Sequence, residues 1–174
     1  TKVNDYVFFI ANTWYNGYQL YKTNGEEYGT SMVRQIGYYL SSMQAPLQLT
    51  AYNDKLYFSV DEGYGRMLWT SDGTWEGTTP AKGAGNAFMV QDYLTFFTKN
   101  PFIILNNALY ISARTYYDGA GLYKYDASND EGLVLVKDLT SLNWETNFIV
   151  PIDMRLVDDA IYMKVVSSIS GWHD

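Results

Sequence analysis

The stretch that decides the fold is a motif that occurs more than once in the chain: Gly65-Arg66-Met67-Leu68-Trp69-Thr70-Ser71-Asp72-Gly73-Thr74-Trp75-Glu76-Gly77-Thr78. A looser copy runs from Gly17 to Thr30, and a more decayed third copy runs from Gly119 to Asp126. In all three copies a glycine stands three residues before a leucine, and an aromatic residue follows that leucine. The chain is therefore expected to be built from repeated structural units.

A second recurring element lies upstream of each copy and confirms the spacing. It consists of the pairs Asn4-Asp5, Asn53-Asp54, Asn106-Asn107 and Asp158-Asp159, separated by steps of 49, 53 and 52 residues. A period of about 50 residues is typical of propellers and solenoids. The repeats are expected at about 4–52, 53–105 and 106–157, with a partial fourth at 158–174. We expect one repeat array over 1–174 that is part of a longer chain or is completed by assembly.

The second repeat predicts four antiparallel strands, at residues 47–52, 55–60, 66–70 and 78–82. Asn53-Asp54 tolerates positive φ at both positions and suits a two-residue type I′ hairpin. Asp72-Gly73 predicts another turn. The fourth strand is weakened by Pro80, because proline donates no ladder hydrogen bond.

Three consecutive apolar or aromatic positions align in the second strand of every repeat. The columns are Val7, Leu56, Leu109 and Ile161; Phe8, Tyr57, Tyr110 and Tyr162; and Phe9, Phe58, Ile111 and Met163. Neighbouring residues of a strand point to opposite faces, so both faces of this strand are expected to be covered by sheets. We predict an all-β chain of consecutive four-stranded antiparallel blades, forming a β-propeller or propeller-like array of about three and a half repeats.

Residues 68–78 resemble a bacterial repeat whose core reads E-L-W-x-x-D-G-T-x-x-G-T, with Met67 where the glutamate usually stands. Residues 53–58 and 134–139 resemble the strands that precede and follow that core. The third copy departs from the pattern, with Ala127 for the glycine and Gly132-Leu133 for Gly-Thr. The resemblance implies a β-propeller-like array of large secreted or surface-attached bacterial proteins, a family with no agreed activity.

Composition and charge narrow the classes of partner. The net charge of −7 argues against binding nucleic acid or anionic membrane surfaces. No apolar stretch approaches the roughly 18 residues of a membrane-spanning helix, so no membrane insertion is expected. The absence of cysteine excludes disulfides and thiolate metal sites. The 17 tyrosines, 8 phenylalanines and 5 tryptophans favour strands and contact surfaces.

The acidic residues and the single histidine do not have the number or spacing that a catalytic site or a metal site requires. Asp72-Gly73-Thr74 is similar to part of a calcium loop, but the six to eight oxygen ligands of such a site are lacking, so we interpret it as a turn. The carboxylate pairs Glu26-Glu27, Asp61-Glu62, Asp130-Glu131 and Asp158-Asp159 are interpreted as solvated turn residues rather than a glycosidase pair. The single histidine, His173, lacks the partners of a triad or a three-histidine zinc site. We expect no catalytic residue, no metal and no cofactor.

The loops expected between the first and second strands of each repeat carry the best candidates for binding. Aromatic rings beside amides and carboxylates suit both stacking on sugars and contact with proteins. The competing interpretation is that these rings cap the blade core or stand singly on a tyrosine-rich surface. The candidate ligand-binding residues are Trp14, Tyr15, Asn16, Tyr64, Tyr116, Tyr117 and Asp118.

Three classes of function follow. The first, which we favour, is a non-catalytic recognition or adhesion module, secreted or at the cell surface, that binds glycan or protein through these loops. The second is a structural subunit that self-assembles through open blade edges into a ring, a filament or a surface layer. The third, least favoured, is a propeller-type hydrolase or lyase with its catalytic groups on loops, for which Glu62 is the test residue.

Overall fold

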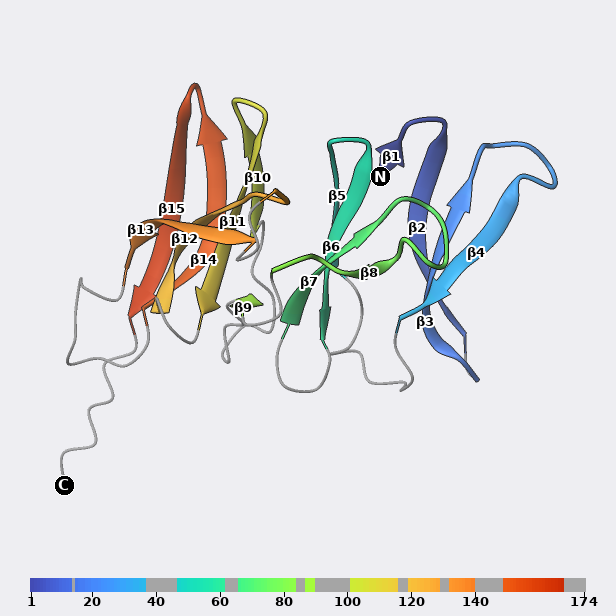
Figure 1. Cartoon of the computed structure of the whole chain (residues 1–174), viewed down its shortest axis with the longest axis horizontal. Coiled ribbons are helices and arrows are strands. Elements are labelled where there is room, and N and C mark those ends of the chain that lie inside the picture. The colour runs from blue at the N-terminus through green and yellow to red at the C-terminus, as the bar shows by residue number, and fades with distance from the viewer. Residues whose placement is uncertain are drawn as a thin grey trace. The chain divides into compact units, whose positions relative to one another are not determined.

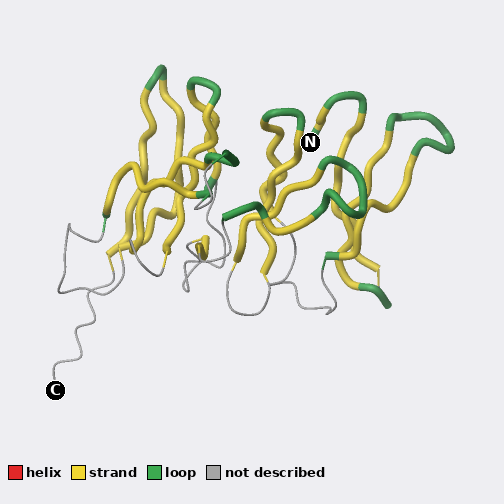
Figure 2. The backbone as a smooth tube through the Cα atoms, viewed as in Figure 1, coloured by secondary structure: helices red, strands yellow, loops and turns green. Residues whose placement is uncertain are grey.

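The structure is a computed structural model of the 174-residue chain and describes residues 1–13, 15–36, 47–61, 66–83, 87–89, 101–115, 119–128, 132–139 and 149–167. These residues form strands and turns, with no helix among them (Figure 2). The chain divides into two compact units, unit 1 at Thr1–Gly85 and unit 2 at Asn86–Asp174. Each unit holds two of the predicted repeats.

The first repeat forms a four-stranded antiparallel sheet in unit 1 (Figure 1). Its strands are β1 (Lys2–Val3), β2 (Tyr6–Thr13), β3 (Gly17–Thr23) and β4 (Thr30–Gln35), paired in chain order. We call this the first sheet. Sequential pairing through hairpins is the arrangement that the sequence predicts for each repeat.

The second repeat forms the other half of unit 1. Its strands β5 (Leu47–Tyr52), β6 (Lys55–Asp61), β7 (Arg66–Ser71) and β8 (Thr79–Pro80) pair in sequence order, each antiparallel to the next. Three strands start where the sequence predicts. The last is reduced to two residues, as expected for a strand that contains a proline.

Unit 2 contains the third repeat of the chain and the first two strands of the fourth, with the same antiparallel pairing. Strands β10 (Phe102–Leu105), β11 (Ala108–Thr115), β12 (Gly119–Tyr125) and β13 (Leu133–Asp138) pair in order, and the short β9 (Ala87–Met89) also pairs with β11. Strands β14 (Ile149–Val157) and β15 (Ala160–Ser167) form an antiparallel hairpin. We call this pair the fourth-repeat hairpin.

The recurring Asn/Asp pairs are the two-residue turns that the sequence predicts. The flanking residues pair directly across each turn: Val3 with Tyr6, Tyr52 with Lys55, Leu105 with Ala108, and Val157 with Ala160. Asn53 and Asp54 have φ of 46° and 57°, and Asn106 and Asn107 have 49° and 54°. Positive φ at both central residues is the type I′ geometry, which suits the twist of a hairpin.

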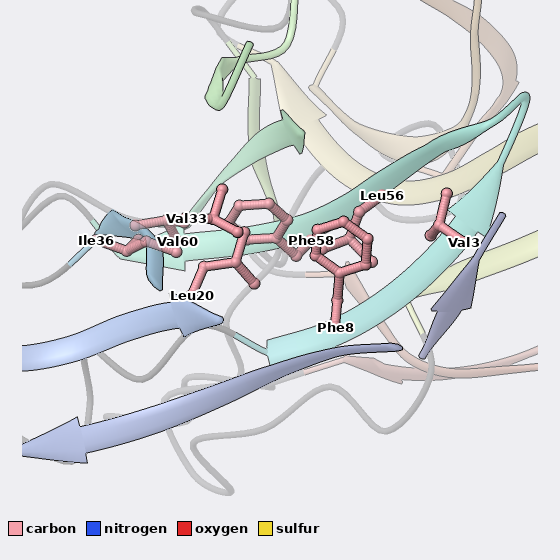
Figure 3. Packing of buried hydrophobic residues seen from close by; sticks show 8 residues of the cluster. All are labelled: Val3, Phe8, Leu20, Val33, Ile36, Leu56, Phe58 and Val60. Atoms are coloured by element: carbon pink, nitrogen blue, oxygen red, sulfur yellow. The ribbon is translucent and has the colours of Figure 1, made fainter. Parts of the chain in front are cut away.

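The core of unit 1 lies between its two repeats. The first sheet contributes Val3, Phe8, Leu20 and Val33, Ile36 follows its last strand, and strand β6 contributes Leu56, Phe58 and Val60 (Figure 3). Ile10, Leu49, Ala51 and Trp69 pack around this cluster. One face of the first sheet is therefore sealed by the second repeat.

Unit 2 contains the same kind of contact between its third repeat and the fourth-repeat hairpin. Ile103, Leu122 and Met154 form a buried cluster, with Leu105, Tyr110, Ile161 and Met163 packed against it. Tyr110 aligns with Phe8, and Leu122 aligns with Leu20. The packing of one repeat against the next thus recurs in each unit with equivalent residues.

At the three aligned positions in the second strand of each repeat, the side chains of the middle repeats are more deeply buried than those of the outer repeats. Leu56, Tyr57 and Phe58 of the second repeat are all at most 3% exposed, as predicted for a strand covered on both faces. In the third repeat Leu109 and Ile111 are fully buried, but Tyr110 is only half-buried. The outer repeats differ, because Val7, Phe9 and Tyr162 are 45%, 36% and 60% exposed. The prediction that all four repeats are covered on both faces is therefore wrong for the first and fourth.

The third repeat keeps the geometry of the first although its sequence motif has decayed. In the first sheet the register shifts between Leu20 and Tyr21, which places Arg34 opposite Leu20. In the third repeat the register shifts between Leu122 and Tyr123, which places Lys137 opposite Leu122. A β-bulge at the same place in both sheets shows that the repeats share backbone structure beyond the residues that match.

Candidate functional site

The Asp72-Gly73-Thr74 segment is a self-capped turn, as predicted. Asp72 Oδ1 accepts hydrogen bonds from the Thr74 amide at 2.8 Å and from Thr74 Oγ1 at 2.7 Å. Gly73 has a φ of 89°, which only glycine adopts without strain. The carboxylate is thus engaged with its own backbone, which is the arrangement of an Asx-turn.

The same cap occurs in the two weaker copies of the motif. Asn24 Oδ1 accepts from the Glu26 amide at 3.1 Å, and Asp126 Oδ1 accepts from the Ser128 amide at 2.9 Å and from Ser128 Oγ at 2.6 Å. Asp126 therefore repeats both bonds of Asp72, with serine in place of threonine. The third copy, weak by sequence, is a genuine structural copy at this turn.

The second glycine of the motif is explained by the same side chain. A methyl group added at Gly77 would overlap the carboxylate of Asp72, and one added at Gly29 would overlap the amide of Asn24. The capping side chain occupies the space in which a Cβ would lie. This contact links the first and last parts of D-G-T-x-x-G-T.

A hydroxyl pair closes the motif beneath the turn. Ser71 Oγ and Thr78 Oγ1 lie 2.7 Å apart in the interior, and Thr23 Oγ1 and Thr30 Oγ1 lie 2.9 Å apart in the first sheet. In the third repeat the aligned residues Tyr125 and Leu133 are apolar or aromatic and are buried. In the third copy of the motif, the pair of hydroxyl side chains is thus replaced by the buried side chains of Tyr125 and Leu133.

The turn shifts the pKa of Asp72 downward. The largest cause is the hydrogen bond from the Thr74 side chain, followed by the one from its amide, and Lys55 adds a small favourable charge. Hydrogen bonds to the ionised form favour that form. The shift reflects the cap and requires no bound cation.

Two basic side chains of the first sheet hold this turn, and the sequence does not reveal them. Lys22 Nζ donates to the Gly73 carbonyl at 2.8 Å, and Arg34 Nη1 donates to the carbonyls of Trp75 and Thr78 at 3.0 and 2.7 Å. The Arg34 guanidinium also lies 5.0 Å from the centre of the Trp75 ring. These partners are 41 to 51 residues apart in the sequence, so no local pattern connects them.

Of the predicted ligand-binding residues, the structure describes Tyr15 and Asn16. Tyr15 is 97% exposed, at the tip of the β2–β3 hairpin. Asn16 beside it is anchored through its backbone, because its amide donates to Thr13 Oγ1 at 3.3 Å and its carbonyl accepts from Gln35 Nε2 at 2.8 Å. An exposed aromatic ring thus stands on a backbone that is held in place.

The other predicted residues lie outside the described part of the chain: Trp14, Tyr64, Tyr116, Tyr117 and Asp118. The strands that flank their loops are described and equivalent, since Thr13 pairs with Gly17, Asp61 with Arg66, and Thr115 with Gly119. All three aromatic loops therefore join the second and third strands of a repeat. The prediction that they join the first and second strands is wrong, because the Asn/Asp pairs form the turns between those two strands. The interpretation that Tyr15 caps a blade core is wrong, because its ring is almost fully exposed.

A buried arginine stands at the base of the second aromatic loop. Arg66 is 4% exposed, and its Nη1 donates to Ser59 Oγ at 3.4 Å within the β6–β7 pair. Burial lowers the pKa of its guanidinium, and the nearby Asp61 carboxylate opposes this shift. The backbone of Arg66 lies opposite that of Asp61 in the ladder, at the end of this hairpin.

The described carboxylate pairs lie in turns, as predicted. Glu26-Glu27 and Asp158-Asp159 are exposed turn residues, whereas Glu62, Asp130, Glu131 and His173 lie outside the described residues. For Asp61 the prediction is wrong, because it is the last residue of strand β6 and is half-buried. Across the described ranges no three His, Cys, Asp or Glu side chains are grouped to hold a metal ion. In the same part of the chain no helix is long and apolar enough to cross a membrane.

Comparison of the chain with protein-family models, curated proteins and solved structures gives no match. The resemblance to the E-L-W-x-x-D-G-T repeat remains a prediction from the residues that carry it.

Proposed function

We propose that this chain is a non-catalytic recognition or adhesion module that binds glycan or protein through the loops between the second and third strands of its repeats. The observation that carries the proposal is the 97% exposure of Tyr15 on the anchored backbone of Asn16. A tyrosine immobilised in its backbone loses little conformational freedom on binding, and it offers both a ring face and a hydroxyl.

The supporting scaffold is proposed to be a β-propeller-like array. Such an array requires consecutive repeats that pack face to face. In unit 1 two four-stranded repeats pack in this way, and in unit 2 the third repeat packs on the fourth-repeat hairpin. In a row of this kind, equivalent loops emerge on one side, so the candidate residues of the two repeats of unit 1 would form one surface. A ligand with repeated sugar units would then contact several loops together.

Location at the cell surface or outside the cell is proposed from the resemblance to repeats of secreted and surface-attached bacterial proteins. The net charge of −7 accords with a partner that is neither nucleic acid nor an anionic membrane surface. The proposed ligand is therefore neutral or basic in its contact region. Neutral glycans satisfy this condition.

The test is binding of the intact chain to a glycan array and to a panel of purified surface proteins. Tyr15→Ala and Tyr117→Ala are expected to lower binding by roughly twofold to tenfold, because stacking on one ring contributes about 0.5–1.5 kcal/mol. Tyr28→Ala is the matched control, since Tyr28 is 91% exposed but lies in the turn at the opposite end of the β3 strand.

Two results decide the proposal. Loss of binding in the two loop variants, with Tyr28→Ala unchanged, supports it. A folded wild-type chain that binds neither glycan nor protein at micromolar concentration removes it, and so does equal loss in all three variants.

A further inference from the structure

The charged side chains of the first sheet are gathered away from the loop between β2 and β3. Residues 6–21, which form β2, this loop and most of β3, include no aspartate, glutamate, lysine, arginine or histidine. The basic residues of β3 and β4, Lys22 and Arg34, both donate hydrogen bonds to main-chain carbonyls of the 72–78 turn in the second repeat. The strands on either side of this loop therefore bring no charged side chain to it.

The corresponding loop of the second repeat has a different chemistry. The strand before it ends at Asp61, and the strand after it begins at Arg66. The sequence of the loop itself includes Glu62. Of the two aromatic loops in unit 1, the first is thus the one suited to a ligand without charge.

The side chain of Asn16 is available to a ligand at the first loop. Its main-chain amide and carbonyl are both held, but its exposed side-chain amide forms no hydrogen bond with any residue that the structure describes. The other Asn-Gly pair of the chain differs, because Asn24 Oδ1 accepts from the Glu26 amide and caps its own turn. Asn16 therefore presents two donors and one acceptor on a fixed backbone.

The exposed aromatic surface at this loop is a single ring. Tyr15 is almost fully exposed, whereas the nearby Thr13 and Tyr18 are half-buried. A specific protein partner buries about 800 Å² on each side, around an apolar centre. One ring beside one amide matches a single sugar unit more closely, because the C–H face of a sugar stacks on the ring while its hydroxyl groups meet the amide.

We propose that the first aromatic loop binds an uncharged sugar unit, with Tyr15 stacked on the C–H face of the sugar and the Asn16 side chain hydrogen-bonded to its hydroxyl groups. This inference rests on the proposed function and narrows it to one class of ligand. An amide both donates and accepts, as a hydroxyl group does. A uronate would require a cation and an amino sugar would require a carboxylate, and residues 6–21 supply neither.

Titration calorimetry of the intact chain tests the class of ligand. The probes are short oligosaccharides of four kinds: a neutral hexose, an N-acetylhexosamine, a uronate and an amino sugar. Binding is expected for at least one of the two neutral kinds and for neither of the charged kinds. The affinity should change by less than about twofold between about 0.05 and 0.5 M sodium chloride, because salt screens only contacts between charges.

The same substitution at the two Asn-Gly pairs tests the role of the amide. Asn16→Ala retains the main-chain bonds of residue 16 and removes the side-chain amide, so the affinity for the neutral sugar should fall roughly twofold to tenfold, the range of one hydrogen bond. Asn24→Ala is the matched control, because Asn24 caps the turn at the opposite end of β3. It should leave the affinity unchanged. Circular dichroism should show that both variants are folded.

The outcomes distinguish this inference from the proposed function. If the chain binds a protein but no sugar, or binds a charged oligosaccharide as tightly as a neutral one, the recognition function stands and this inference is overturned. An unchanged affinity for the neutral sugar in folded Tyr15→Ala or Asn16→Ala overturns it as well. A chain that binds neither sugar nor protein removes both proposals together.

Discussion

The ammonium group of Lys22 donates a hydrogen bond of 2.8 Å to the main-chain carbonyl of Gly73, which lies 51 residues further along the chain. The contact joins the first sheet to the turn of the second repeat, at the point where Phe8 also approaches that glycine. Gly73 therefore has two functions, because its positive φ makes the turn and its missing side chain admits the neighbouring sheet. The motif is a device for stacking repeats as well as for turning a strand.

The first prediction concerns this lysine. Lys22→Met keeps the aliphatic stem but removes the donor, and it is expected to lower the free energy of unfolding by about 1.5–3 kcal/mol, the scale of a hydrogen bond to a charged group. Urea unfolding followed by tryptophan fluorescence measures the change. Lys124→Met is the matched control, because Lys124 aligns with Lys22 but is exposed, and its replacement should change stability by under about 0.5 kcal/mol.

The second prediction compares two phenylalanines of one column. Phe58→Ala is expected to cost about 3–5 kcal/mol, because Phe58 is fully buried between the repeats of unit 1. Phe9→Ala should cost about 1–2 kcal/mol, because the ring of Phe9 is already partly exposed. If both variants lost the same free energy of unfolding, the contribution of each phenylalanine would depend on its aligned position in the repeat and not on whether a neighbouring sheet covers it.

The turns and strands were predictable because their signals are local. Asn53-Asp54 and Asn106-Asn107 tolerate positive φ, and Pro80 cannot support a long strand, so neighbouring residues suffice to locate these elements. The columns also predicted burial for the middle repeats. They failed for Val7, Phe9 and Tyr162 because cover depends on whether another sheet is present, which the side chain itself does not encode.

The site was predictable to a smaller extent. Aromatic loops between equivalent strands could be located from the repeat, and Tyr15 is exposed as a contact residue must be. The anchoring of the 72–78 turn by Lys22 and Arg34 could not be located, because isolated basic residues on strands have no distinctive pattern. Basic residues recur at both positions in the third repeat, as Lys124 for Lys22 and as Lys137 for Arg34, and this recurrence is the signal that the sequence offers.

The third prediction is a pH dependence at the Asp72 cap. The pKa of Asp72 is lowered in the folded chain, so its stabilising contribution is complete above its unfolded pKa of about 3.9. As the pH falls through the lower folded pKa, the carboxylate is protonated and the contribution is lost. The stability difference between wild type and Asp72→Asn should be constant from pH 7 to about 4 and should change only below that range.

The comparison needs a cap that does not titrate. Asn24 caps the equivalent turn of the first sheet through an amide oxygen. The cost of Asn24→Ala should therefore be the same at acid and neutral pH. If the stability cost of both substitutions changed with pH in the same way, the pH dependence would belong to the protein as a whole and not to the Asp72 carboxylate.

The last prediction tests the contact between Asp72 and Gly77. Gly77→Ala places a methyl group where the carboxylate lies, and the least costly relief is for that carboxylate to swing into solvent and lose both bonds to Thr74. Gly77→Ala and Asp72→Ala should then each cost about 1–2 kcal/mol. The double variant should cost no more than the worse single one, because both changes remove the same cap.

Gly121→Ala provides the contrast for that double-mutant cycle. A methyl group at Gly121 would overlap the main-chain carbonyl of Lys137 on the adjacent strand, and a backbone atom in a ladder cannot rotate away. Its cost should exceed that of Gly77→Ala, and no side-chain deletion should relieve it. Strict additivity of Asp72→Ala and Gly77→Ala in urea unfolding would contradict the contact, since independent sites add and sites that share a hydrogen-bonded cap do not.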